Sequence, residues 1–89
     1  MIRRELTIIN RLGLHARAAA KLVTTAAHFA SNLRLEREGK SADAKSIMAV
    51  MMLSANKGSV ITVEASGEDE AAASEAIAAL VAQRFGEDE

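Results

Sequence analysis

The spacing of hydrophobic residues changes several times along these 89 residues, and each change limits what the chain can fold into. Alternation with a period of two predicts half-buried strands, whereas a period near 3.6 predicts amphipathic helices. Strands are expected at 5–10, 33–36, 41–45 and 59–65, and helices at 16–30, 46–53 and 66–85. The order is therefore βαββαβα. Elements that are apolar on one side only favour a two-layer α/β (α+β) sandwich, in which helices cover one face of a sheet and leave the other face in water.

Single residues set the expected buried faces and boundaries of these elements. The first helix should bury one stripe, namely Ala19, Leu22, Val23, Ala26, Ala27 and Ala30. Ser66 followed by Asp69 offers a capping box for the last helix. Gly86, directly after Phe85, is the expected stop signal of that helix.

Length and composition favour one domain, residues 1–89, with a thin aliphatic core. Nineteen residues are alanine, two are phenylalanine, and there is no Trp or Tyr. The absence of Cys excludes a disulfide framework, a thiolate metal site and a thiol nucleophile. The first residues lack a long apolar segment, and no apolar run approaches the roughly 20 residues that span a bilayer. A cytoplasmic location without membrane insertion is therefore expected.

Charge is distributed unevenly along the chain. Residues 1–63 hold ten Lys or Arg and four acids, whereas residues 64–89 hold one Arg and eight acids. This predicts a basic side and an acidic side if the last element packs apart from the rest. Nucleic acid is not an expected partner, because the pI is about 6.1 and there is no aromatic surface for stacking. Residues 87–89, Glu-Asp-Glu, are interpreted as a frayed and solvated tail.

The two histidines differ in their expected surroundings. His28 lies on the polar side of the first helix near its end, where a histidine is favourable next to the helix dipole. His15 lies at the start of that helix, where it can be an N-cap or a functional residue. The amides of the next three residues and the helix dipole form an anion site, and the Arg17 guanidinium suits phosphate oxygens. A nucleophilic imidazole beside an anion site is what a phosphohistidine needs. No metal-ligand cluster or cofactor motif competes with it, so no metal or cofactor is expected.

Two segments carry a family resemblance. Residues 10–17, Asn-Arg-Leu-Gly-Leu-His-Ala-Arg, resemble the active-site segment of the HPr family. These proteins are the histidine-containing phosphocarriers of the bacterial phosphoenolpyruvate-dependent phosphotransferase system. Residues 45–51, Lys-Ser-Ile-Met-Ala-Val-Met, resemble the family's regulatory serine region, and residues 57–58 and 65–67 also match. The resemblance covers essentially the whole chain. It implies an open-faced sandwich whose antiparallel sheet has the strand order 1-4-2-3 and is covered by three helices.

The resemblance also implies a function. His15 accepts a phosphoryl group at Nδ1 from phosphorylated Enzyme I and passes it to a IIA domain, while the amides of Ala16 and Arg17 and the Arg17 guanidinium offset the phosphate charge. An HPr serine kinase/phosphorylase acts on Ser46, which is also a favourable N-cap. The chain is then a monomeric carrier and not a free-standing enzyme. One position departs from the family pattern, because Ala18 stands where the family usually has proline.

Two partners that use one surface in turn need basic and apolar residues around His15. The expected docking residues are Arg17, Lys21, Lys45, Ile47, Met48 and Met51. Met48 and Met51 are expected to be partly exposed, and Met52 and Leu53 to lie in the core. Three alternatives stay open: a nitrogen-related branch of the same family, a regulatory binding module that has lost the relay, and a small ligand-binding α/β domain.

Overall fold

The computed structural model describes residues 1–88, and its elements follow the predicted order βαββαβα. The strands are β1 (Ile2–Thr7), β2 (Asn32–Arg37), β3 (Lys40–Asp43) and β4 (Val60–Ser66). The helices are α1 (Ala16–Ala26), α2 (Ile47–Met52) and α3 (Glu70–Ala82), followed by a 3₁₀ turn, η1 (Arg84–Gly86). No helix within residues 1–88 combines the length and apolar character needed to cross a membrane.

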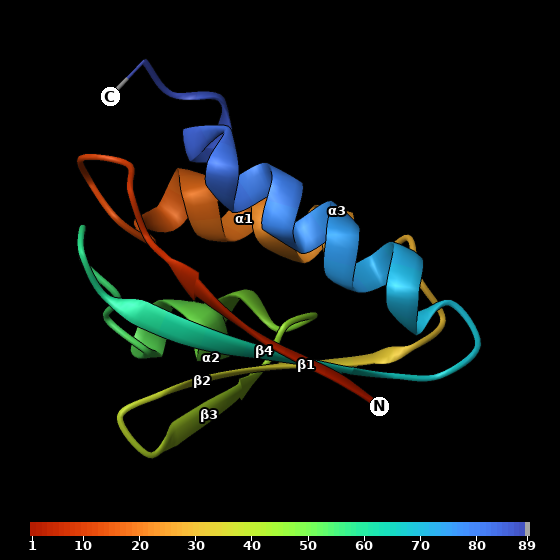
Figure 1. The fold of residues 1–89 in the computed structure, drawn as a ribbon. Coiled ribbons are helices and arrows are strands. Elements are labelled where there is room, and N and C mark those ends of the chain that lie inside the picture. The colour runs from red at the N-terminus through yellow and green to blue at the C-terminus, as the bar shows by residue number, and fades with distance from the viewer. Residues whose placement is uncertain (89) are drawn as a thin grey trace.

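The four strands form one antiparallel sheet in the order β1-β4-β2-β3, which confirms the order that the family resemblance implied. In the register, Leu6 of β1 lies opposite Ile61 of β4, and Val63 of β4 lies opposite Leu35 of β2. Strand β1 is an edge strand and β4 lies between it and β2, and the two ends of the chain lie at opposite ends of the molecule (Figure 1).

The core lies between the sheet and the helices. Helices α1 and α3 lie side by side over one face of the sheet (Figure 1). The fully buried residues of this layer include Leu22 of α1, Ile61, Val63 and Ala65 of β4, and Ile77 of α3. The other face of the sheet carries ion pairs. Arg3 of β1 binds Glu64 at 2.7 Å and Glu36 at 3.6 Å. This arrangement confirms the predicted sandwich with one solvated sheet face.

The acidic helix α3 does not pack apart from the basic part of the chain. It lies against β1, where Arg4 binds Glu75 at 2.8 Å, and the N-terminal amino group of Met1 binds Glu70 at 3.2 Å. The predicted separation into a basic and an acidic side required α3 to pack apart from the rest of the chain. This separation does not occur along the α3–β1 contact, where opposite charges are interleaved.

Helix α1 ends earlier than its sequence pattern predicts. Its last residue is Ala26, so Ala27 and Ala30, which were expected on the buried stripe, lie past the helix and are exposed. The side chain of Ala18 is buried instead. The physical reason is a competing partner: the backbone N–H groups of Ala30 and Ser31 donate to the carboxylate of Asp69, each at 2.9 Å. Those donors are not available to continue the helix.

The predicted capping box at Ser66 is wrong. Helix α3 begins at Glu70 with Asp69 at the N-cap, and the Asp69 carboxylate binds Ser31 and Ala30 and not its own helix. These hydrogen bonds, led by that of the Ser31 hydroxyl, hold the pKa of Asp69 below its usual range. Gly67 allows the approach: its φ is +149°, and a Cβ there would lie 2.8 Å from the Cα of Ser31.

The short helix α2 confirms one prediction and corrects another. The Ser46 hydroxyl accepts a hydrogen bond from the Ala49 N–H at 3.4 Å, so Ser46 is the N-cap as predicted. Leu53 is buried as expected, but Met52 is 71% exposed and does not belong to the core. The face that packs inward carries Val50, and Leu53 lies three residues later on the same face, whereas Met52 does not.

Candidate functional site

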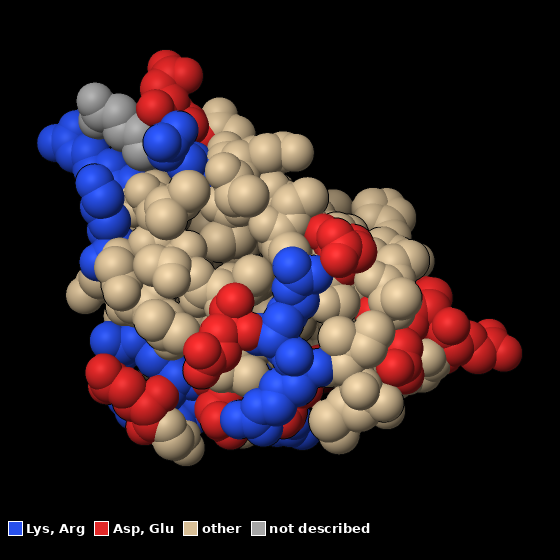
Figure 2. All heavy atoms as spheres, viewed as in Figure 1, with Lys and Arg blue, Asp and Glu red and all other residues tan. Residues whose placement is uncertain are grey.

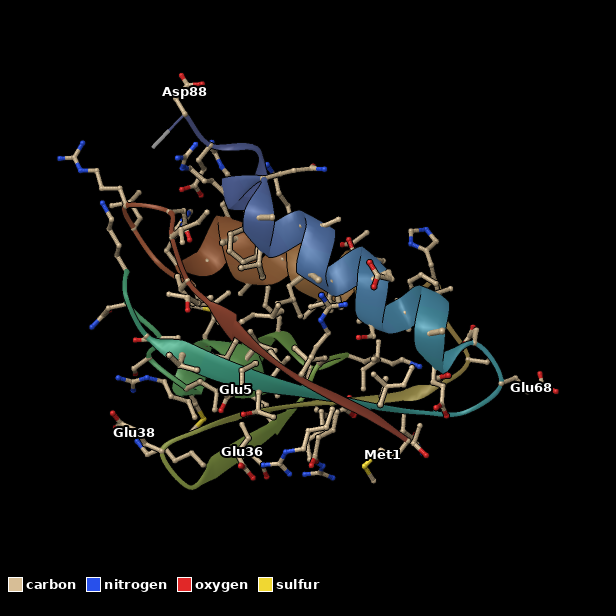
Figure 3. All side chains as sticks on the ribbon, in the orientation of Figure 1. Met1, Glu5, Glu36, Glu38, Glu68 and Asp88 are labelled. Atoms are coloured by element: carbon tan, nitrogen blue, oxygen red, sulfur yellow. The ribbon has the colours of Figure 1, made fainter. Side chains whose placement is uncertain are left out.

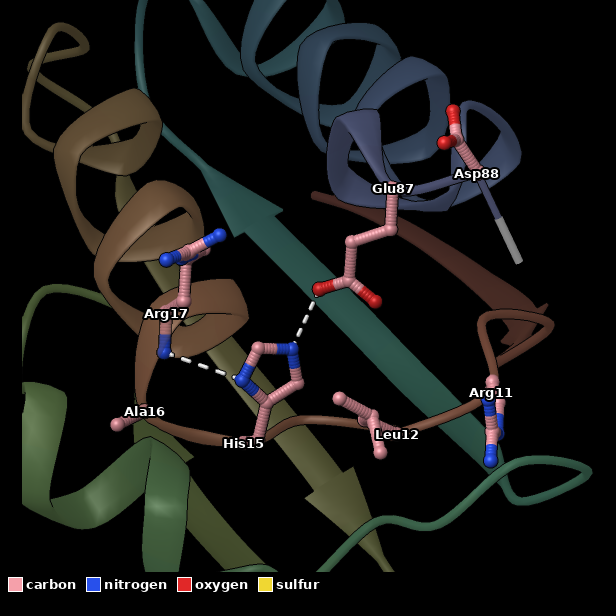
Figure 4. Close-up of a pocket in the computed structure, with 7 residues that line it drawn as sticks. All are labelled: Arg11, Leu12, His15, Ala16, Arg17, Glu87 and Asp88. Carbon is pink, nitrogen blue, oxygen red and sulfur yellow. Dashed lines mark hydrogen bonds and ion pairs between the residues drawn. The ribbon is translucent and has the colours of Figure 1, made fainter.

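His15 is the N-cap of α1. Its backbone is extended, with φ −73° and ψ 177°, and its carbonyl oxygen accepts from the Ala19 N–H at 2.8 Å. Its side chain turns back over the helix start, where Nδ1 accepts from the Arg17 N–H at 3.3 Å (Figure 4). One ring nitrogen therefore faces the positive end of the helix dipole and its unsatisfied amides.

The loop between β1 and α1 is held in place directly before this histidine. Leu14 is buried, and its N–H donates to the carbonyl of Ala55 at 2.8 Å. Gly13 has φ +67° and passes so close to Ala55 that a Cβ would overlap its carbonyl oxygen. The buried side chain of Asn10 donates to the Gly13 carbonyl at 2.8 Å. His15 is thus presented from a tightly held turn and not from a mobile loop.

Glu87 is part of the site, although nothing in its sequence neighbourhood was interpreted in this way. Its carboxylate binds Nε2 of His15, and its Oε1 accepts from Nδ2 of Asn10 at 3.1 Å (Figure 4). The expected frayed tail is therefore wrong for Glu87, whose side chain is only 18% exposed. Glu89, the third residue of that tail, lies outside the described residues.

The path of the chain after α3 explains how Glu87 reaches His15. Three successive residues, Arg84, Phe85 and Gly86, have φ of 56°, 55° and 79°, so the chain reverses within η1. The Phe85 ring is completely buried, and Nζ of Lys21 donates to the Phe85 carbonyl at 2.6 Å. The buried Phe85 ring holds this reversal of the chain against the core, and the reversal places Glu87 beside α1.

The electrostatics of Glu87 follow from its partners. Partial burial raises the pKa of the Glu87 carboxyl, but the hydrogen bonds from His15 and Asn10 outweigh it, so the pKa lies below its usual range. An ionised carboxylate only accepts hydrogen bonds, so Nε2 of His15 must carry the proton. Since the Arg17 N–H donates to Nδ1, that nitrogen carries a lone pair. The network assigns the neutral ring its Nε2–H tautomer.

A cleft of about 750 Å³ opens beside the imidazole. It is lined by Arg11, Leu12, His15, Ala16, Arg17, Glu87 and Asp88 (Figure 4). Lys and Arg side chains gather on this end of the molecule, next to the C-terminal segment (Figure 2). Leu12, which sequence analysis did not single out, is 63% exposed and adds an apolar rim. Cationic, apolar and acidic groups thus surround one nucleophilic nitrogen.

Four further predicted site residues lie on α1 and α2. Lys21 is one helical turn after Arg17, and Ile47, Met48 and Met51 are 39%, 68% and 38% exposed on α2, which packs against α1. These four and Arg17 are called the docking surface below.

Lys45 lies elsewhere. Its Nζ donates to the carbonyl of Phe29 at 2.8 Å, beyond the C-terminal end of α1, whereas His15 is at the N-terminal end. Helix α1, which has eleven residues and is about 16 Å long, lies between that carbonyl and His15. Within residues 1–88 there is no group of three or more side chains able to hold a metal ion.

Known proteins resemble this chain over its full length. The sequence profile of a family described as PTS HPr component phosphorylation site matches residues 2–83. The chain is 55% identical to phosphocarrier protein HPr of Cupriavidus necator over 89 residues, 100% of both proteins. It is 42% identical over 86 residues to phosphocarrier protein NPr of Shewanella violacea, covering 97% of this chain and 94% of that protein. The crystal structure of HPr-C-His from Thermoanaerobacter tengcongensis superposes with a TM-score of 0.96 at 40% identity, covering 100% of both chains.

Proposed function

The chain belongs to the HPr family of phosphocarrier proteins, and we propose that it accepts a phosphoryl group on His15 from phosphorylated Enzyme I and passes it to IIA domains of the phosphotransferase system. The observation that carries this proposal is the orientation of the imidazole: Nδ1 bears a lone pair and faces the first amides of α1. The relay runs in a single cytoplasmic domain, and the protein is a covalent intermediate in it.

The start of α1 supports the binding of a phosphoryl group at Nδ1. Once Nδ1 forms a bond to phosphorus, it no longer accepts from the Arg17 N–H, and that amide turns to a phosphate oxygen. The helix dipole and the neighbouring amide of Ala16 favour the same negative charge. The exposed Arg17 guanidinium stands at the cleft rim, where its planar donors suit phosphate oxygens.

The docking surface supports the use of two partners in turn. Its methionines are flexible and polarisable, which suits a surface that meets differently shaped proteins. Arg17 and Lys21 add positive charge, which attracts an acidic partner surface. Enzyme I and the IIA domains are therefore proposed to meet the molecule over α1 and α2, around His15.

Ser46 is proposed as a regulatory site for an HPr serine kinase/phosphorylase. Its hydroxyl already caps α2, and Ile47 and Met48, which follow it, belong to the docking surface. A phosphoryl group adds nearly two negative charges there. It therefore acts on docking and leaves the imidazole itself untouched.

Two alternatives remain to be compared with this proposal. The similarity to a protein named NPr favours testing the nitrogen branch, in which the phosphoryl group goes to a regulatory and not a sugar-specific IIA domain. Transfer from the phosphorylated chain to one IIA domain of each kind separates the two branches. A regulatory binding module without a relay is the alternative of a different class, and it accepts no phosphate at all.

The decisive experiment is incubation with phosphoenolpyruvate and Enzyme I, followed by intact-mass measurement. We expect one acid-labile, base-stable phosphate on the wild type and on His28→Ala, and none on His15→Ala. His28 is the matched control, because it is an exposed histidine beyond the other end of α1. Phosphorylation of His15→Ala contradicts the site, and an unmodified wild type contradicts the carrier function.

A further inference from the structure

We propose that Glu87 is a positioning residue for His15, holding the imidazole in the tautomer whose Nδ1 can attack phosphorus. The inference rests on the proposed carrier function and assigns that function a third side chain besides His15 and Arg17. Glu87 is 72 residues away from His15 in the sequence, so only the fold brings them together.

The carboxylate of Glu87 is oriented by two donors, one for each oxygen. Oε2 binds Nε2 of His15, and Oε1 accepts from Nδ2 of Asn10 at 3.1 Å. Asn10 is completely buried and is itself tied to the Gly13 carbonyl, so its amide is a fixed reference for the carboxylate. A carboxylate held in this way keeps the ring orientation and the Nε2 proton in place, as second partners of functional histidines commonly do.

The backbone that carries Glu87 supports a role beyond an incidental contact. Arg84 and Phe85 both have left-handed φ angles, which are unfavourable for residues with side chains. The burial of Phe85 and the hydrogen bond from Lys21 hold this strained segment against α1. Strain of this kind persists only where surrounding contacts impose it, and it gathers at functional sites.

The chemistry of transfer explains what the carboxylate contributes. The Nδ1 lone pair of His15 forms the new bond to phosphorus, and the donor's bond to the same phosphorus breaks, its electron pair leaving with the donor. The ring keeps its Nε2 proton during this step and becomes positively charged. The ionised Glu87 on Nε2 stabilises that charge. In the reverse step, the proton on Nε2 makes the ring a better leaving group.

Glu87→Gln is the sharpest test, because the amide keeps the size of the side chain, removes its charge and replaces one of its two accepting oxygens with an N–H donor. Glu68→Gln is the matched control. Glu68 is exposed on the turn before α3 and points away from the molecule at the end opposite Asp88 (Figure 3). Both variants change the net charge equally, so a general charge effect moves both.

Two measurements are made on the wild type and both variants. The first is ¹⁵N and ¹H NMR of the His15 ring at about pH 9, where an imidazole is neutral. We expect a protonated Nε2 with a low-field proton in the wild type and in Glu68→Gln, and a mixture of tautomers in Glu87→Gln. The second is single-turnover transfer from phosphorylated Enzyme I at saturating concentration. We expect Glu87→Gln to be slower by about tenfold, the difference between a charged and a neutral hydrogen-bond acceptor.

The outcomes separate this inference from the proposed function. If the wild type takes up no phosphate on His15, the proposed function fails and the inference fails with it. If the wild type is phosphorylated and Glu87→Gln has either the wild-type tautomer or the wild-type rate, only the role of Glu87 is wrong. A changed tautomer together with slower transfer, absent in Glu68→Gln, supports the role, because a residue that merely tethers the chain end does not set the tautomer of the His15 ring.

Discussion

The anchoring of the C-terminal segment by Phe85 can be tested with Phe85→Ala. The ring is completely buried, and removing such a ring from a core costs roughly 3–5 kcal/mol. Part of this loss is offset, because Phe85 itself is held in a left-handed conformation that costs roughly 1–2 kcal/mol. Without the ring the segment can detach and release that strain. We therefore expect the free energy of unfolding to fall by about 2–3 kcal/mol, less than for an unstrained core phenylalanine.

The assay combines urea unfolding, followed by circular dichroism, with amide hydrogen exchange. The free energy comes from the unfolding curve. The exchange of the Gly86 amide, which donates to the Gln83 carbonyl at 3.0 Å, reports on local detachment. In Phe85→Ala we expect this amide to lose protection while the strands keep theirs. The segment that carries Glu87 then separates from His15, although both side chains are unchanged.

Phe29→Ala is the control, since Phe29 is the only other phenylalanine of the chain and is half-buried beyond the other end of α1. It should cost less stability and leave the Gly86 amide protected. The reasoning is refuted if Phe85→Ala is no less stable than Phe29→Ala, or if Gly86 in Phe85→Ala exchanges as slowly as in the wild type. Either result means that the ring does not hold the segment in place.

Three further predictions concern single residues. Asp69→Asn should lower the melting temperature at neutral pH. Because the folded pKa of Asp69 is lowered, its contribution is present above its unfolded pKa near 4 and is lost as the pH falls through the folded value. The difference from the wild type should thus shrink in melts below about pH 4, and a constant difference contradicts this. Ser46→Ala should cost roughly 1 kcal/mol in urea unfolding with normal transfer, whereas Ser46→Asp should slow transfer from Enzyme I without lowering the melting temperature; wild-type transfer in Ser46→Asp places the docking surface elsewhere. Arg17→Lys should slow transfer in both directions at unchanged stability, and equal rates show that charge alone suffices.

The parts of the fold that sequence predicted are those specified by neighbouring residues. The strand around Leu35 follows from alternation and the strand around Val63 from its β-branched residues. Ser46 caps α2 through a residue three positions away. His15 could be placed at a helix start for the same reason, because the change of period directly after it marks the boundary. Contacts within a few residues leave a local pattern, and a local pattern can be recognised.

Errors occurred where a distant partner decides the outcome. Asp69 satisfies the Ala30 and Ser31 amides 38–39 residues before it, so neither the end of α1 nor the start of α3 follows its local signals. Met52 was misplaced because every residue of α2 is apolar, which leaves no polar face to indicate the outside. Glu87 looked like part of an acidic tail. The one available signal was Phe85, a large apolar residue directly before Gly86 in an alanine-rich segment, which indicates an anchor.

A carrier has to release the phosphoryl group as readily as it accepts it, and the charges around His15 are suited to this. The helix start and Arg17 stabilise a phosphoryl group on Nδ1, while the Glu87 carboxylate lies on the other ring nitrogen. The carboxylate favours the positive ring that forms during transfer, but it repels the phosphoryl charge that remains afterwards. Near a protein surface each of these interactions is on the order of 1–4 kcal/mol at contact distance. In phosphorylated His15, the helix start and Arg17 attract the phosphoryl charge and the Glu87 carboxylate repels it, so the two effects largely cancel in the equilibrium of transfer. The stabilisation of the positive ring lowers the barrier in both directions. Glu87 should therefore change the rates of transfer more than the equilibrium between the two carriers.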